Sequence, residues 1–151
     1  MTPREALQDA LAAEHAAVWV HGLLGAQTSR SADPSLAARL DEAYTAHRDR
    51  RDRLTDLLVA DDAEPVAALP AYDVPGDLAT AAGVAQAALA LERGCAAVWA
   101  TVVESTAGER RRLAVEVLTE TAVRELDFRG TPEMFPGSSS TRTAVGPGQE
   151  P

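Results

Sequence analysis

The sequence has very little cysteine and no long hydrophobic run. Cys95 is the only cysteine among 151 residues, so an internal disulfide and a zinc site built from several cysteines are excluded. No neighbouring group is placed to activate this thiol, and we expect an inert buried side chain rather than a nucleophile. Because no apolar stretch approaches the length of a membrane span or a signal-peptide core, we expect no membrane partner and a reducing, cytoplasmic location.

Basic and aromatic residues are also scarce. The chain has 14 Lys and Arg against 23 Asp and Glu, a formal net charge of −9, and its densest basic run, residues 47–53, is interleaved with acids. We therefore expect no nucleic-acid partner, because the positive surface that phosphates require is missing. Aromatic residues make up 4% of the chain. Abundant alanine with few aromatics favours closely packed helices, in a chain long enough for a single domain.

Four long segments have the hydrophobic spacing of helices, and none shows the sustained alternation of a strand. Thr2 and Glu5 have the spacing of a capping box at the start of the first segment, and Asp33 before Pro34 marks the start of the second. The sequence therefore predicts an all-α protein. The expected helices cover residues 3–27, 33–60, 77–105 and 108–128.

The composition changes after the fourth expected helix. Residues 130–151 are rich in Gly, Pro, Ser and Thr, and such segments bury too little apolar surface to fold alone. We therefore expect a folded helical domain at 1–129 and a flexible tail at 130–151. Met134 and Phe135 are the tail residues expected to dock back onto the helices.

The linker between the second and third expected helices bears on the topology. Its sequence, DDAEPVAALPAYDVPGD, contains three prolines. About seventeen extended residues span roughly 50 Å, whereas a helix of about 27 residues is roughly 40 Å long. The linker can therefore cross the full length of a four-helix bundle and leave helices two and three parallel, as in ferritin-like proteins. The alternative is an up-down-up-down bundle with a loose loop.

Each expected helix carries an ionisable residue near its midpoint, on the side that should face the core. These residues are Glu14, His47, Glu92 and Glu120, and the midpoints of four antiparallel helices share one layer. Carboxylates and imidazoles that project inward from four helices are ligands suited to iron or manganese. His21 lies roughly 10 Å further along the first helix than Glu14 and is expected in another layer, and His15 is expected on another face.

The pattern of a di-iron centre is incomplete in this sequence. Such a centre takes a Glu-x-x-His motif from each of two helices, and no Glu-x-x-His occurs here. The residue three positions before His47 is Tyr44, and the residue three positions after Glu120 is Val123. Two of the six expected ligands are therefore missing.

Two interpretations of the midpoint residues follow. In the first, Glu14, His47 and Glu92 form a structural polar network without metal, with Arg51 as a buried ion-pair partner; the protein then has no catalytic residue and no cofactor. In the second, Glu14, His47, Glu92 and Glu120 form a degenerate iron or manganese site of a metal-binding protein or oxidoreductase.

Helices one and three are apolar over a wider face than one core can cover. The simplest expectation is a homodimer that buries one of these helices. The alternative is that the linker covers this face with Leu69, Pro70, Tyr72 and Val74, or that the tail does. A third hypothesis is a module that uses the apolar face to bind another protein.

Four stretches together resemble an actinobacterial ferritin-like family of unknown function. They are ALAAEHAAVWVHGLLGA, AHRDRRDRLTDLL, PVAALPAYDVPGD and AQAALALERGCAAVWATVV. The resemblance implies a ferritin-like four-helix bundle and implies no activity. Of the ligand positions in the wider ferritin-like superfamily, Glu14, His47, Glu92 and Glu120 correspond approximately, and the missing Glu-x-x-His pair argues against oxidase or iron-storage activity.

Overall fold

The computed structural model describes residues 1–74 and 76–129, and this part of the chain contains four α-helices and no strand. The all-α prediction is confirmed. Met134, Phe135 and the tail expected at 130–151 lie outside the described residues. No helix in the described part is both long enough and apolar enough to cross a membrane. The helices are α1 (Pro3–Gln27), α2 (Pro34–Ala60), α3 (Ala81–Ser105) and α4 (Gly108–Arg129).

Local sequence signals fix most of the helix ends. The Thr2 side chain accepts a hydrogen bond from the Glu5 backbone, and the Glu5 carboxylate accepts one from the Thr2 backbone, so the predicted capping box is present. Helix α2 begins at Pro34, as predicted. Helix α3 begins at residue 81 rather than 77, because the Thr80 side chain caps it by accepting a hydrogen bond from the Gly83 backbone at 3.0 Å.

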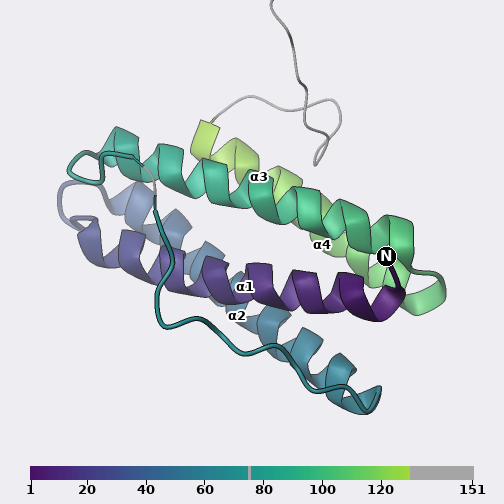
Figure 1. Cartoon of the computed structure of the whole chain (residues 1–151). Coiled ribbons are helices and arrows are strands. Elements are labelled where there is room, and N and C mark those ends of the chain that lie inside the picture. Colours follow the sequence, from purple (N-terminus) through teal and green to yellow (C-terminus); the bar gives the residue numbers. More distant parts are fainter. Residues whose placement is uncertain (75, 130–151) are drawn as a thin grey trace, which may run out of the picture.

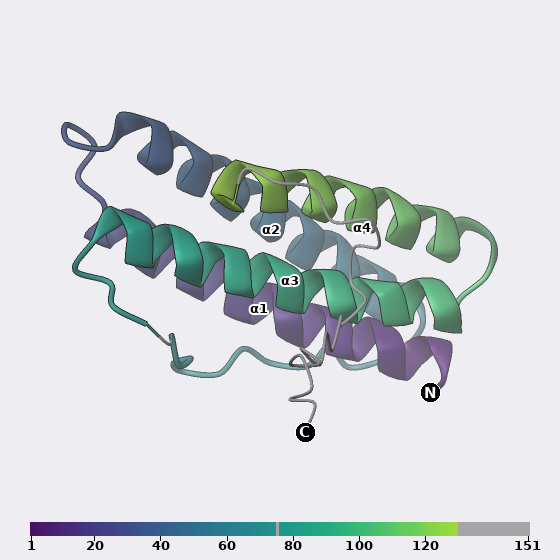
Figure 2. The ribbon, with the colours of Figure 1, turned by 90° about the horizontal axis from the view of Figure 1, so that it is seen from above.

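The helices pack as two antiparallel pairs in two layers. Helices α1 and α2 form one pair and α3 and α4 the other, with α3 over α1 and α4 over α2 (Figure 1, Figure 2). The main helix contacts join α1 to α2, α3 to α4 and α1 to α3. The turn between α3 and α4 is only two residues long and leads into Gly108 at φ +60°, a conformation that costs glycine little. Helices α2 and α4 pack less closely, which leaves room for long side chains between them.

The linker between α2 and α3 runs along the outside of α1, so α2 and α3 point in the same direction (Figure 1). The Gln8 side chain donates to the Glu64 carbonyl at 2.7 Å and accepts from the Val66 backbone at 2.8 Å. Further along, Tyr72 packs against Trp19 with ring centroids 5.9 Å apart. The linker therefore covers part of the apolar face of α1, as one of the sequence-based alternatives anticipated.

The core consists of two clusters that lie along the helices. The larger cluster includes Leu7, Leu11, Leu54 and Trp99, and the second includes Leu24 and Leu40. Buried polar side chains lie between the two clusters rather than apolar ones. The hydrophobic core of the described residues is therefore interrupted by a polar layer.

We predict that Leu11→Ala destabilises the domain by about 2–5 kcal/mol, because it removes a fully buried side chain and leaves a cavity. Urea denaturation followed by circular dichroism measures this change. The control is Val59→Ala, at a position 58% exposed, which is expected to change stability by no more than about 0.5 kcal/mol. A Leu11→Ala variant as stable as its control would contradict this description of the core.

Candidate functional site

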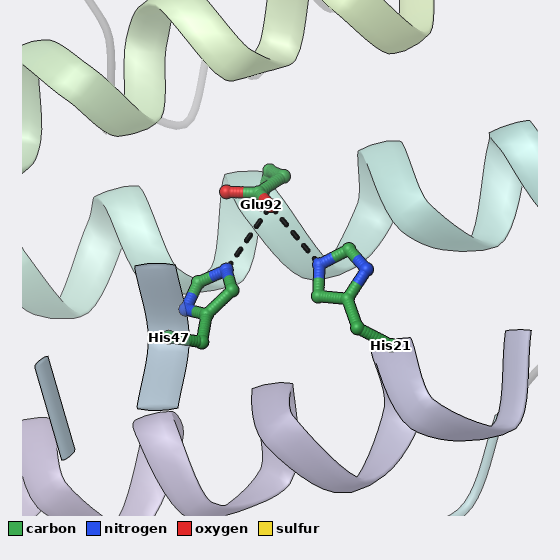
Figure 3. Close-up of side chains that lie close together, drawn as sticks. All are labelled: His21, His47 and Glu92. Atoms are coloured by element: carbon green, nitrogen blue, oxygen red, sulfur yellow. Dashed lines mark hydrogen bonds and ion pairs between the residues drawn. The ribbon is translucent and has the colours of Figure 1, made fainter. Parts of the chain in front are cut away.

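The polar layer is built from three helices. Glu14 of α1, His47 of α2 and Glu92 of α3 are all buried, at the midpoints where the heptad spacing predicted them. His21, two turns after Glu14 on α1, is also buried. Figure 3 shows the His21 and His47 rings directed at Glu92 from two different helices. Three of the four predicted midpoint residues therefore lie in one layer.

His47 bridges the two buried carboxylates. Its Nδ1 lies 2.6 Å from Glu14 Oε2 and its Nε2 lies 3.1 Å from Glu92 Oε1. Both ring nitrogens thus face carboxylate oxygens, and both can donate only if the imidazole is doubly protonated. Burial alone would lower the pKa of His47, but the hydrogen bonds to Glu14 and Glu92 outweigh it and raise the pKa above its ordinary value. The geometry and the raised pKa of His47 both favour an imidazolium that donates to Glu14 and to Glu92.

His21 is held in the opposite state. Its Nε2 lies 3.0 Å from Glu92 Oε1, and its ring stacks on His47 with centroids 5.1 Å apart. Burial lowers the pKa of His21, assisted by the charges of His47 and Arg124, and the hydrogen bond to Glu92 only partly opposes this. A neutral His21 donates from Nε2 to Glu92. Its Nδ1 has no hydrogen-bond partner among the described residues.

Each carboxylate has a further partner. Trp99 donates its indole N–H to Glu14 Oε1 at 2.7 Å, so both oxygens of Glu14 accept a hydrogen bond. Arg124 of α4 forms an ion pair with Glu92 Oε2 at 3.7 Å. Burial would raise the pKa of Glu92, but hydrogen bonds from His21 and His47 and the charges of His47 and Arg124 hold it well below its usual range.

The charges of this layer cancel. Glu14 and Glu92 are anionic, His47 and Arg124 are cationic, and His21 is neutral. We call these five residues and Trp99 the polar network. Buried charges are tolerated when they are paired and hydrogen-bonded. Each charged group of the network has an oppositely charged neighbour, although Glu92 Oε2 and Arg124 make no hydrogen bond.

The structure places the other two predicted site residues elsewhere. The Glu120 side chain is 53% exposed and pairs with Arg50 at 2.9 Å, so it does not join the polar network. Arg51, expected as the buried ion-pair partner, is 28% exposed and pairs with its neighbour Asp52. Arg124 takes the place expected for Arg51 beside Glu92, and Arg50 is the buried arginine of α2, with 6% of its side chain exposed.

The exposure of both Glu120 and Arg51 has the same cause in helix geometry. Core positions on a helix follow one another at steps of either three or four residues. After His47, the step of three leads to Arg50 and the step of four to Arg51, and the pattern does not decide between them. On α4 the buried line passes through Val117, Thr121 and Glu125, one position away from Glu120.

His21 was expected in another layer and instead joins the network. Glu14 and His21 are two turns apart along α1, which is why spacing on that helix alone separates them. His47 of α2 contacts Glu14, and Glu92 of α3 contacts both His47 and His21, so these two residues connect Glu14 to His21. His15 faces away from the core, and its Nε2 bonds the Val66 carbonyl of the linker at 3.1 Å.

The site offers metal ligands but no nucleophile. One ligand atom from each of His21, His47 and Glu92 lies within 4.8 Å of the others, a donor set that suits a divalent transition metal. Binding there requires the His47 Nε2 lone pair, and hence loss of the proton that now bonds Glu92. Burial raises the pKa of the Cys95 thiol well above its ordinary value, so this thiol stays protonated and inert.

Similar proteins carry descriptions that name no activity. Residues 6–140 match the family model described as "Domain of unknown function (DUF4439)". A crystal structure of a conserved hypothetical protein, rv2844, from Mycobacterium tuberculosis is 31% identical, with a TM-score of 0.78 and coverage of 85% of this chain and 88% of that one. No protein with a curated description matches the chain significantly.

We predict that the free energy of unfolding is greatest near pH 6.5, the ordinary pKa of histidine. The raised pKa of His47 gives stability that is complete below pH 6.5 and lost as the pH rises through its folded value. The lowered pKa of His21 gives stability that is complete above pH 6.5 and lost as the pH falls. Each titrating group changes the free energy by up to about 1.4 kcal/mol per pH unit within its window.

Urea denaturation between pH 5 and 8 measures this profile. His47→Gln is expected to remove the decrease in the free energy of unfolding above pH 6.5. His15→Gln, which changes a histidine outside the polar network, is expected to keep the decreases on both sides of pH 6.5. A wild-type stability that continues to rise between pH 6.5 and 8 would contradict the imidazolium assignment.

Proposed function

The chain belongs to the DUF4439 family, a domain of unknown function, and for this member we propose a non-enzymatic binding domain whose polar network is structural. The observation that carries the proposal is the cancellation of charge among Glu14, Glu92, His47 and Arg124. A reactive site usually keeps an unsatisfied or strongly activated group. Here Glu14 accepts a hydrogen bond on each oxygen. Glu92 accepts two on Oε1 and faces Arg124 with Oε2 at 3.7 Å, and the one thiol is buried and protonated.

In this proposal the polar network fixes the axial positions of the four helices relative to one another. His47 of α2 contacts residues of α1 and α3, and Arg124 of α4 contacts α3. A sliding movement of any helix by one turn would separate a buried charge from its partner, which is strongly unfavourable. Buried polar groups are known to fix register in helical assemblies in this way.

We assign the helices to the ferritin-like type of four-helix bundle. Two antiparallel pairs joined by a long linker that runs the length of the helices support this assignment (Figure 1). Inward-facing Glu14, His47 and Glu92 at mid-helix also support it. The absence of any Glu-x-x-His from the sequence separates this chain from the di-iron members of that type.

A second candidate function is metal binding at His21, His47 and Glu92. The convergence of three ligand atoms within 4.8 Å favours it. Glu14 would hold His47 Nδ1 from behind, as carboxylates commonly do for metal-bound histidines. Arg124 opposes it, because its positive charge remains beside Glu92 and raises the cost of bringing in a divalent ion.

We predict that the purified protein binds less than about 0.1 equivalent of Fe(II) or Mn(II) per chain at neutral pH, with an unchanged melting temperature. The protein is loaded anaerobically, then in air, and analysed by elemental mass spectrometry. About one equivalent per chain with a raised melting temperature would overturn the structural proposal. Glu92→Gln would abolish such binding, whereas Glu120→Gln, at a carboxylate outside the network, would keep it.

We propose that the domain forms a homodimer through the outer face of α3. The linker covers part of α1, whereas small side chains at Ala90, Gly94 and Ala97 are exposed on α3, and small residues permit close helix approach.

We predict a dimer in multi-angle light scattering at micromolar concentration and a monomer for Gly94→Arg. Ala12→Arg, on an exposed position of α1, is the matched control and is expected to stay dimeric. A monomeric wild-type protein would refute this interface.

A further inference from the structure

We propose that the cleft between α2, α3 and α4 binds a carboxylate with an unbranched alkyl tail, the carboxylate on Arg124 and Arg50 and the tail along α4. The cleft adjoins the polar network and shares Trp99 and Arg124 with it. The proposal goes beyond the structural role of that network, because it names a ligand class for the binding domain.

The cleft has the size and composition of a small-molecule site. Its volume is about 430 Å³, within the range of ligand pockets, which combine apolar walls with a few polar groups. It lies where α2 and α4 pack less closely. The apolar part of its wall is formed by buried side chains of all three helices, namely Leu54, Trp99, Leu113 and Val117.

The charged side chains that line the cleft differ in how deeply they are buried. Three arginines and three acidic residues line it, so its formal charge is zero. The arginines Arg50 and Arg124 are 6% and 15% exposed, whereas the acidic Asp49, Glu116 and Glu120 are all exposed. Water screens the exposed acids, and charges in a less polar interior act more strongly at short range. The third arginine, Arg53, is exposed like the acids. The most deeply buried charged groups of the lining are therefore two guanidiniums, of which Arg50 pairs with Glu120 and Arg124 with Glu92 behind it.

The two buried guanidinium groups have unused hydrogen-bonding capacity. Among the described residues, Arg124 forms its ion pair with Glu92 at 3.7 Å and no hydrogen bond. Arg50 donates to Thr121 and Glu120 at 2.9 Å, and its Nε has no partner. A guanidinium has five N–H donors that match the two oxygens of a carboxylate. An anion is therefore the ligand that these groups lack.

The length and the apolar lining of the cleft suit a ligand with an extended apolar tail. Arg124 and Leu113 lie eleven residues apart on α4, so the cleft extends roughly 16 Å along the helix at 1.5 Å per residue. The guanidinium groups lie toward one end, and Leu54 and Leu113 line the other. An extended alkyl chain fits this length with its carboxylate at Arg124. The carboxylate competes with exposed Glu120 for Arg50 and with buried Glu92, 3.7 Å away, for Arg124.

The test is calorimetric titration of the full chain with decanoate, below its micellar concentration, at neutral pH. We expect saturable binding of one decanoate per chain, with affinity falling about tenfold for each two carbons removed from the tail. Decanol and decyltrimethylammonium, which keep the tail and lose the anion, are expected to bind at least about tenfold more weakly. Equal binding of all three ligands would overturn the proposal, as would no binding of decanoate.

Variants locate the site on the protein. Arg124→Gln is expected to weaken decanoate binding about tenfold or more, through loss of charge-assisted hydrogen bonds. Arg112→Gln, at an exposed arginine of the same helix outside the cleft, is expected to bind as wild type. Equal affinities for these two variants would place the ligand elsewhere and refute the assignment.

A second readout does not depend on the arginines. Trp99 lines the cleft and Trp19 packs under the linker, so decanoate should change the fluorescence of Trp19→Phe, in which Trp99 alone emits. Val117→Phe narrows the apolar end and is expected to weaken decanoate more than hexanoate. Circular dichroism confirms that each variant is folded. An unchanged Trp99 signal at saturating decanoate would contradict binding in this cleft.

Discussion

His47 holds two buried carboxylates on opposite sides of one ring, and the arrangement of the helices depends on this contact. Glu14 at 2.6 Å and Glu92 at 3.1 Å come from α1 and α3, which lie in different layers of the structure. Two carboxylates so close together and so deeply buried would repel each other without a cation between them. The doubly protonated imidazole supplies that cation and both hydrogen bonds.

The same constraint shapes the neighbouring surface. Glu92 needs a second cation because His21 is neutral, and Arg124 extends from α4 to supply it. Arg50 spans from α2 to α4 and pairs with Thr121 and Glu120. The Arg50 side chain therefore connects α2 with α4 across the cleft. A cleft therefore lies between α2 and α4, whereas α1 packs closely on both α2 and α3.

The pairing of charges within the polar network bears on whether mid-helix histidine and glutamate bind metal in this chain. Histidine and glutamate at mid-helix are metal ligands when their charges are otherwise unpaired. In this chain an arginine and a protonated histidine occupy the role that cationic metal plays in a di-iron bundle. Under the structural proposal the polar network is the counterpart of such a centre, and the cleft beside it is the surface proposed for carboxylate binding.

Local spacing and the apolar side of each helix were enough to predict the four helices, the capping box of α1 and the midpoint positions of Glu14, His47 and Glu92. The start of α3 was predicted four residues too early. The sequence by itself did not determine that Arg50 rather than Arg51 is buried, since steps of three and four residues both keep a side chain on the core face. It also left His21 outside the network and Glu120 inside it. Only the tertiary structure decided these points, because the rotation and axial offset of neighbouring helices determine which side chains from different helices meet.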